Sequence, residues 1–244
     1  MMNFRLPFLA ITLLITSLQA SAQRDWSKYE LGVNLGTYIY SGDLTPTSTA
    51  GFKTPGPSLG LTLSRQLRPS LALRGELNFG QLNGDDSRFD EPEWRKQRNF
   101  AFKTRISEAT LNLVWSPVMI TSNLRPYIFG GAGLALISVR RDYSNFNPEF
   151  FTGENIQGRL AEDISTKIPR VIPVIPVGIG LRYHLGERLS VNAEAAYRHT
   201  TTDYLDGYSK SANPGVGDRY FKYSVGLIYS FRGNKQWDCP VLLP

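Results

Sequence analysis

Apolar and polar residues alternate with a period of two along the segment Arg219–Arg232, close to the C-terminal end of the chain. One face carries Phe221, Tyr223, Val225, Leu227, Tyr229 and Phe231, and the other carries Lys222, Ser224, Gly226, Ile228, Ser230 and Arg232. An apolar face of this period that ends on an aromatic residue is typical of a strand with lipid on one side and a packed polar interior on the other. The segment therefore predicts a transmembrane strand of a bacterial outer membrane.

Seven further segments have strand character. The eight predicted strands are Lys28–Tyr40, Ser58–Leu67, Ser70–Leu82, Phe100–Trp115, Leu124–Arg140, Val171–Leu185, Leu189–Thr202 and Arg219–Arg232. Four long connections and three short ones alternate between them, as in an up-and-down antiparallel barrel. Both termini then lie at the short-turn end, which is periplasmic in outer-membrane barrels. The predicted fold is an all-β, eight-stranded antiparallel transmembrane barrel spanning residues 23–232.

Two strands contain local irregularities. In strand four the apolar residues change parity, from even numbers at Phe102 and Ile106 to odd numbers at Leu111 and Leu113, which predicts a bulge near Ser107. In strand six, two prolines that cannot donate to a ladder are expected at its frayed, loop-proximal end. These prolines are Pro173 and Pro176. Strand five is rich in small residues, and its expected outward side chains are those of Ile128, Ala132, Leu134 and Leu136.

Aromatic residues predict two interfacial girdles. The girdle expected near the short turns comprises Tyr29, Trp115, Tyr127, Tyr183, Tyr229 and Phe231. The girdle expected near the long loops comprises Tyr38, Tyr40, Phe79, Phe100, Tyr197 and Phe221. The second long connection, 83–99, mixes acidic and basic residues, which predicts a solvated loop.

The inward series of residues is polar. A soluble eight-stranded barrel of the lipocalin type would reverse this facing pattern, so the soluble alternative is disfavoured. Eight strands enclose an interior that side chains fill, which predicts a packed network of ion pairs rather than a pore. The expected members are Arg74, Glu76, Glu108, Arg182, Glu194, Arg198 and Lys222. A proton or ion path through this cluster is the functional alternative.

The two ends of the chain lie outside the predicted barrel. Residues 1–22 resemble a secretory signal, with a basic Arg5, an apolar run and a small-residue cleavage site. Residues 233–244 form a predicted periplasmic tail that binds a partner, folds back as a plug or is disordered. Its candidate contact residues are Trp237, Cys239 and Pro240. Cys239 is the single cysteine, which excludes an intramolecular disulfide and leaves a free thiol or an intermolecular bridge.

The charge distribution and the residue types do not indicate an enzyme, a bound cofactor or a metal site. The formal charge of +6 comes from scattered basic residues, a distribution that does not indicate nucleic-acid binding in an exported chain. A nucleophile, a base and an orienting carboxylate of a lipid hydrolase would have the residue types of Thr201, His199 and Asp203. However, polar residues are common where a strand meets a loop. The histidines and the cysteine lack metal-ligand spacing.

Several short motifs resemble those of the PorG-like outer-membrane barrels. They are the segments Glu30–Val33, Tyr40–Leu44, Gly80–Asp86, Pro126–Gly133 and Tyr197–Asp206, together with the late Cys239–Pro240 pair. The resemblance covers most of the mature chain, and the Thr202–Asp206 segment and the tail are its more specific parts. The third long loop departs from the family because it lacks a glycine-rich segment after Phe146–Phe151.

The resemblance implies a component of the type IX protein secretion system. Such a barrel would anchor a periplasmic ring complex in the outer membrane and would carry no catalytic residue. Its partners would be outer-membrane lipid and periplasmic or outer-membrane proteins of the complex, bound through the short turns and the tail. The alternative is a stand-alone barrel that anchors or adheres through its surface loops.

Overall fold

The computed structural model describes residues 26–45, 50–117, 123–153, 155–212 and 217–231. Eight strands account for most of them: β1 (Tyr29–Ser41), β2 (Gly56–Arg68), β3 (Leu71–Asp85), β4 (Ala101–Trp115), β5 (Leu124–Asp142), β6 (Val171–His184), β7 (Leu189–Thr200) and β8 (Arg219–Ser230). Every predicted strand is confirmed. The predicted signal segment and the tail with Trp237, Cys239 and Pro240 lie outside the described residues.

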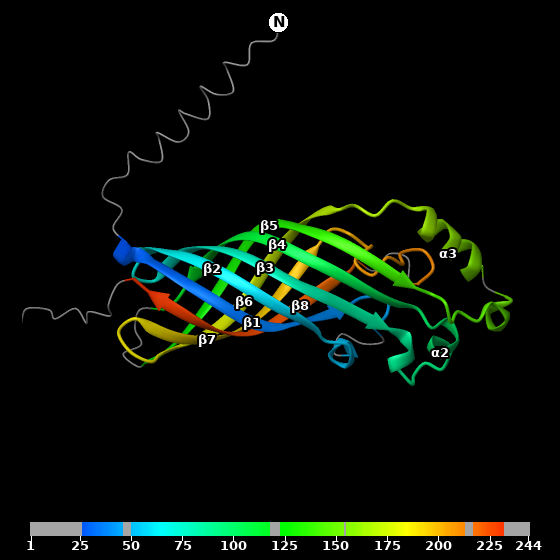
Figure 1. The fold of residues 1–244 in the computed structure, drawn as a ribbon, viewed down its shortest axis with the longest axis horizontal. Coiled ribbons are helices and arrows are strands. Elements are labelled where there is room, and N and C mark those ends of the chain that lie inside the picture. The colour runs from blue at the N-terminus through cyan, green and yellow to red at the C-terminus, as the bar shows by residue number, and fades with distance from the viewer. Residues whose placement is uncertain (1–25, 46–49, 118–122, 154, 213–216, 232–244) are drawn as a thin grey trace, which may run out of the picture.

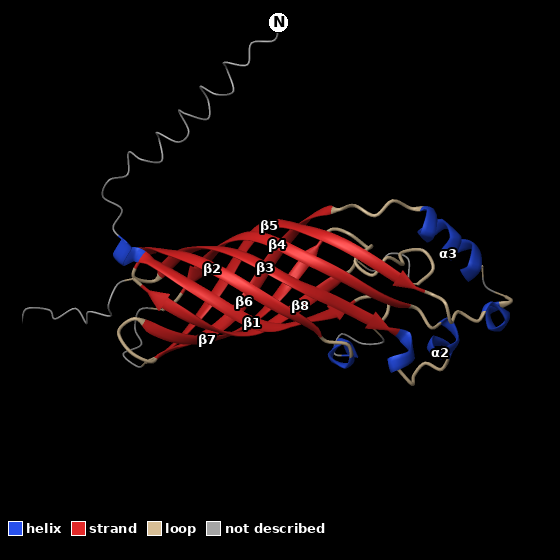
Figure 2. Ribbon diagram, in the orientation of Figure 1, coloured by secondary structure: helices blue, strands red, loops and turns tan. Residues whose placement is uncertain are grey.

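The strands form one closed antiparallel barrel in sequence order, from β1 to β8. The first and last strands close it, with partners that run from Glu30 opposite Ser230 to Ser41 opposite Arg219. The short turns and the ends of the described chain lie at one end of the barrel, and the long connections with their helices lie at the other (Figures 1 and 2). Closure pairs every strand on both sides and leaves no open sheet edge.

The side-chain alternation of the middle of the barrel follows the prediction. Apolar residues such as Leu35, Ile179 and Val225 point outward, with exposed fractions of 62%, 63% and 64%. Their neighbours Asn34, Gly178 and Ser224 point inward, where they are buried or nearly so. The outward facing of Ile128, Ala132, Leu134 and Leu136 in β5 is also confirmed. This belt of exposed apolar side chains is the surface that lipid would cover.

The bulge predicted near Ser107 is wrong. The partners of β4 continue without a register shift on both sides, from Ala101 to Trp115, and its side chains alternate throughout. What changes at Ser107 is the surroundings of the two faces. Below it, towards Trp115, the outer face is apolar and the inner face polar, whereas above it Lys103 and Arg105 point outward and Phe102 and Ile106 point inward.

The two prolines lie in the loop-proximal half of β6, as predicted, but they take part in its ladder rather than in a frayed end. Pro173 is opposite Leu134 in β5, and Pro176 is opposite Arg198 in β7. The β5–β6 pairing is interrupted between Gly130–Val177 and Gly133–Val174. The interruption includes Pro176, whose nitrogen has no hydrogen to donate.

Four of the predicted girdle aromatics are not on the outer face. Tyr38, Tyr40, Phe100 and Tyr127 are buried inside. In β1 the inward positions are even-numbered, so Tyr38 and Tyr40 follow Asn34 into the interior. In β5 the outward series starts at Ile128, which turns Tyr127 inward. The other predicted girdle aromatics are at outward positions. Tyr29, Trp115, Tyr183, Tyr229 and Phe231 lie at the short-turn end, and Phe79, Tyr197 and Phe221 lie nearer the long loops.

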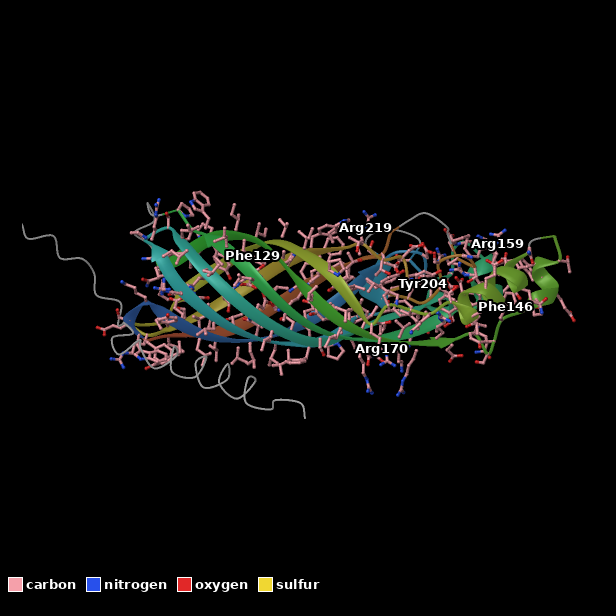
Figure 3. The ribbon with its side chains drawn as sticks, turned by 90° about the horizontal axis from the view of Figure 1, so that it is seen from above. Phe129, Phe146, Arg159, Arg170, Tyr204 and Arg219 are labelled. Carbon is pink, nitrogen blue, oxygen red and sulfur yellow. The ribbon has the colours of Figure 1, made fainter. Side chains whose placement is uncertain are left out.

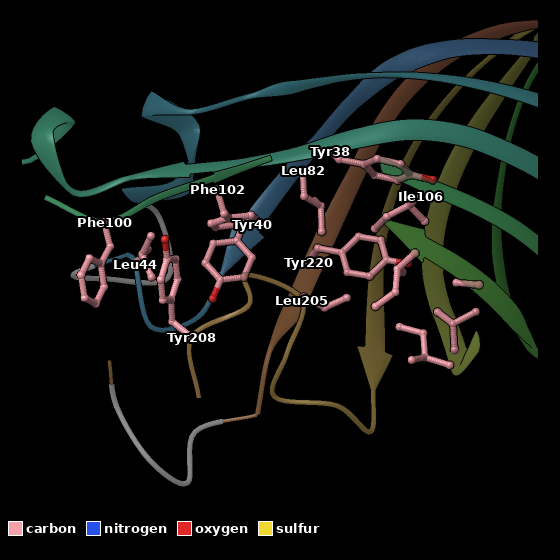
Figure 4. Close-up of a cluster of buried hydrophobic side chains, with 14 of the residues drawn as sticks. Tyr38, Tyr40, Leu44, Leu82, Phe100, Phe102, Ile106, Leu205, Tyr208 and Tyr220 are labelled. Atoms are coloured by element: carbon pink, nitrogen blue, oxygen red, sulfur yellow. The ribbon is translucent and has the colours of Figure 1, made fainter. Parts of the chain in front are cut away.

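The long connections fold together over the mouth of the barrel. They contain the helices α2 (Trp94–Arg98) and α3 (Ile156–Ser165) and three 3₁₀ turns, Ala50–Lys53, Asp86–Arg88 and Pro148–Phe151, while a fourth 3₁₀ turn, Trp26–Lys28, precedes β1. One buried apolar cluster joins them to the upper strands (Figure 4). It includes Tyr40 of β1, Phe102 of β4, Phe151 and Leu160 of the third long connection and Leu205 of the fourth. We call the long connections, together with the apolar cluster beneath them, the cap. None of the described helices is long and apolar enough to cross a membrane.

Candidate functional site: the lumen network and the cap

The centre of the barrel contains ion pairs that cross it. Arg74 of β3 donates from Nη1 to Oε1 of Glu194 of β7 over 2.5 Å. These strands are four positions apart in an eight-stranded ring, so they face each other across the lumen. Arg198 of β7 donates from Nε to Oε2 of Glu108 of β4 over 2.9 Å. Side chains from opposite walls therefore meet at the axis and block it.

Glu76 joins these pairs into one network. Its Oε1 accepts from Nζ of Lys222 over 2.7 Å and lies 3.7 Å from Nη2 of Arg198. Its Oε2 lies 3.7 Å from Nη2 of Arg74. All of these side chains are buried, where an unpaired charge would be costly.

The lumen network is balanced in charge. It holds three cations, Arg74, Arg198 and Lys222, and three carboxylates, Glu76, Glu108 and Glu194. Equal numbers of opposite charges at contact distance leave no net field that would attract a cation or an anion to the axis. The arrangement is suited to structural closure of the lumen.

Arg182, the seventh predicted member, lies apart from the other six. It makes a bidentate pair with Glu30, whose oxygens accept over 3.0 and 2.7 Å. Both residues line a cavity of about 80 Å³ at the short-turn end. The inward position of Glu30 follows from its parity in β1, but its pairing with Arg182 does not, because β1 and β6 are not neighbouring strands.

Neutral side chains complete the network, and none of them was predicted to be a member from the sequence. Tyr220 donates to Glu108, Tyr127 donates to Glu194 over 2.6 Å, and Lys222 donates to Asn78 over 2.5 Å. The guanidinium of Arg74 also lies 4.3 Å from the centre of the Phe129 ring. The signal in the sequence was the inward position of these residues in the alternation of their strands. For Tyr127 that signal was missed because the residue was assigned to an aromatic girdle.

Two aspartates of the fourth long connection meet at the hydroxyl of Tyr40 at the base of the cap. Their carboxylate oxygens lie 2.9 Å (Asp206) and 2.5 Å (Asp218) from that hydroxyl. The other oxygen of Asp218 accepts from the backbone N–H of Leu205 over 2.8 Å, and Asp206 accepts from that of Tyr208 over 2.8 Å. The carboxyls therefore anchor this connection to β1.

Burial determines the protonation of this pair. It raises the pKa of Asp206 well above the usual range, with the nearby Asp218 carboxylate as the next cause. Burial also raises the pKa of Asp218, to about 7, although the hydrogen bond from Tyr40 opposes the rise. The Tyr40 hydroxyl has a single proton and cannot donate to both carboxylates at once. At neutral pH the pair is therefore stable with at least one carboxyl protonated.

The solvated loop predicted over 83–99 is wrong in part. Asp86, Arg95 and Arg98 are buried, and Asp86 accepts from Nη1 of Arg95 over 2.8 Å and from Nε of Arg98 over 2.6 Å. Mixed charges can be buried when they neutralise each other, and composition alone does not reveal that pairing. In α3, Asp163 similarly accepts from the backbone N–H groups of Lys210 and Ser211 over 3.0 and 2.8 Å. These contacts hold the connections against one another.

The three residues that imitate a hydrolase are not brought together. Asp203 accepts from the hydroxyl of Ser209 over 2.6 Å, and the ring of His199 lies beside that of Tyr197, with 6.4 Å between the ring centres. His184 faces Oγ of Ser190 at 2.9 Å. Among the described residues, no group of three or more His, Cys, Asp or Glu side chains is placed to hold a metal ion.

The family model described as outer membrane protein beta-barrel domain matches residues 8–231. No curated protein matches the chain. Among solved structures, Neisserial surface protein A is 14% identical, with 84% of this chain and 97% of that chain covered and a TM-score of 0.45. Ail, the attachment invasion locus protein of Yersinia pestis, is 12% identical, with 82% and 96% covered and a TM-score of 0.44. The outer membrane enzyme PagL is 13% identical, with 82% and 97% covered and a TM-score of 0.38.

Proposed function

The chain belongs to the outer membrane protein beta-barrel domain family, and from that premise we propose that it is a non-enzymatic anchor for a protein complex rather than a channel. As a member of this family it is an integral protein of the outer membrane, where lipid surrounds its apolar belt. The orientation rule of such barrels places the short turns in the periplasm and the cap outside the cell.

The observation that carries this proposal is the closed lumen. Six charged side chains of balanced sign meet across the barrel, and the cap covers its outer mouth. Neither feature provides a path for a solute. Catalysis is disfavoured because Asp203 is engaged with Ser209 rather than with His199. An integral protein whose described residues form neither a path nor a catalytic group is suited to holding other proteins at the membrane.

We infer further that the complex is the type IX protein secretion system. The support is the resemblance of the sequence to PorG-like barrels, most specifically at Thr202–Asp206 and at the Cys239–Pro240 pair. Within the first of these segments, Asp206 is a buried anchor of the cap, so this motif serves the fold. Partner binding is then assigned to the periplasmic turns and to the predicted tail, residues 233–244, with Trp237, Cys239 and Pro240.

Removal of the tail tests this assignment. A chain that ends at Gly233 and the full-length chain are each purified from membranes in mild detergent, and the co-purifying periplasmic proteins are identified. We expect the truncated chain to lose its ring partners, because the tail is the longest periplasmic segment. A full-length Cys239→Ser variant is the matched control and separates loss of the thiol from loss of the whole tail.

Retention of every periplasmic partner by the truncated chain would contradict binding by the tail. The resistance of the folded barrel to detergent without heating shows whether the truncated chain is assembled, so that a folding failure is not mistaken for lost binding.

A stand-alone barrel that acts through its outer surface is the second candidate. One observation favours it. The connections of the cap are bonded to one another, because Asp163 of α3 accepts from the backbone of Lys210 and Ser211 in the fourth long connection. Exposed aromatic residues on this layer, such as Phe150 at 54%, could contact another surface. This candidate predicts that the full-length chain co-purifies with no periplasmic partner.

A further inference from the structure

On three adjacent strands the outward residues change from apolar to polar or basic at the same level. The last apolar row contains Phe79 of β3 and Leu136 of β5, which flank Ser107 of β4. Two residues further along each strand, the outward row is Gln81, Arg105 and Ser138. The next row is Asn83, Lys103 and Arg140. Basic side chains therefore begin immediately above the belt that lipid covers.

The height of these rows matches the lipid headgroups. Two residues of a strand span roughly 7 Å, which a tilt of about 40° reduces to roughly 5 Å of height per row. Arg105 then lies about 5 Å above the hydrocarbon edge, and Lys103 and Arg140 lie about 10 Å above it. The headgroup layer on each side of a bilayer is roughly 5–8 Å thick, so long side chains from both rows reach it.

The basic side chains are not neutralised by the protein. Lys103, Arg105 and Arg140 are exposed, and none of them makes a side-chain hydrogen bond or ion pair with another residue in the described part of the chain. Lys103 and Arg140 are direct partners across β4 and β5. Like charges in directly opposed positions destabilise a sheet, so this pair is favourable only with an anion beside it.

A groove is present at the same place. Its volume is about 510 Å³, and its lining includes Lys103 and Arg140 on the strands with Lys53 and Arg88 from the connections above. Two acidic residues also line it, Asp85 and Asp142. Asp85 already pairs with Arg88 at 3.7 Å, and both carboxylates lie one row above Lys103, further from the lipid.

We propose that the basic collar, formed by Lys103 and Arg140 in the groove and by Arg105 one row below it, binds the phosphate groups of lipids in the outer leaflet. A phosphate carries the negative charge that would neutralise the opposed Lys103 and Arg140. The acyl chains of the same lipid would lie on the apolar belt below. Arg170 and Arg219 lie at about the same height on the barrel, whereas Arg159 lies further out on the cap (Figure 3). The inference requires membrane insertion but not a role in secretion.

Binding of a phosphorylated lipid tests the collar. Full-length protein in a non-ionic detergent is titrated with bisphosphorylated lipid A, and the bound fraction is measured by native mass spectrometry. Each cation near an anionic membrane surface contributes roughly a fivefold factor, so we expect the K103Q/R140Q variant to bind about 30-fold more weakly. The matched control, R159Q/K167Q, loses the same charge from the cap, and its affinity should stay within about twofold of that of the unchanged protein.

Three results would overturn the proposal. Equal binding of lipid A by K103Q/R140Q and by the control would show that the collar is not the site. Equal binding of dephosphorylated lipid A would show that phosphate is not recognised. Displacement of lipid A by inorganic phosphate at equal concentration would show that the ligand is a free anion rather than a lipid. Unheated gel mobility confirms that each variant is folded.

Discussion

At the scale of single residues, burial decides how the ionisable side chains act. The lumen carboxylates face cations at contact distance, as Glu194 does with Arg74. Asp206 and Asp218 instead face each other and a phenol. A carboxyl that is buried without a cation favours its protonated form. The connection anchored by this pair therefore depends on pH.

Replacement of Asp218 tests this dependence. Because its pKa is raised to about 7 in the folded state, the folded state holds more protons than the unfolded state between pH 4 and 7. The anchor is then fully stabilising below about pH 4 and weakens as the pH rises through 7. Hydrogen exchange at the amides of Leu205 and Tyr208, corrected for intrinsic rates, measures the equilibrium constant for opening of the anchor. This constant should increase as the pH rises, by at most about tenfold per pH unit for each proton lost.

The Asp218→Asn variant retains a carbonyl acceptor and cannot ionise. It should lose most of the pH dependence of opening at Leu205, while the surface variant Asp142→Asn should retain it. An Asp218→Asn protein with the same pH profile as the unchanged protein would contradict the assignment.

At the scale of elements, β4 passes through two surroundings. In β4 the outward residues are apolar up to Ala109 and basic at Arg105 and Lys103, and the inward residues change in the opposite sense from Glu108 to Ile106. The strand continues in register through this change. The inversion of polarity therefore identifies the edge of the membrane, where lipid outside gives way to water and the polar lumen gives way to the apolar cap.

Arginine substitution at two outward positions of β4 tests this boundary. Leu111→Arg places a charge within the lipid belt and should lower the free energy of unfolding by roughly 2–4 kcal/mol. Ala101→Arg lies above the belt and should change it by about 0.5 kcal/mol or less. Both values are measured by urea unfolding of protein reconstituted in vesicles. Equal losses at the two positions would show that the membrane edge does not lie between them.

Sequence patterns were sufficient for the strands but not for what joins them. A period of two is a local property, and it predicted all eight strands and the inward facing of Arg74 and Glu194. The pairing of those residues depends on closure of the barrel, which brings together positions 120 residues apart. The bulge at Ser107 was wrong because a change of parity can reflect either an inserted residue or new surroundings. The cap was missed because its core is assembled from separate connections.

At the scale of the whole molecule, two cores of opposite polarity are stacked along one barrel. The lower core is a neutral ion network inside an apolar shell, and the upper core is an apolar cluster inside a polar shell. Each core is the inverse of the other because the solvent outside changes from lipid to water. Both cores close the interior, so the surfaces left for function are the lipid belt, the collar, the cap and the periplasmic end.

Ion conductance across a planar bilayer tests the closed interior most directly. Purified full-length protein is inserted in symmetrical potassium chloride, and current is recorded at holding potentials of both signs, with a larger porin as the positive control for the bilayer. The charge-balanced lumen and the cap predict that insertion produces no discrete conductance steps. Reproducible steps of uniform size, with a dependence on protein concentration, would show an open path and contradict the assignment of the barrel as an anchor.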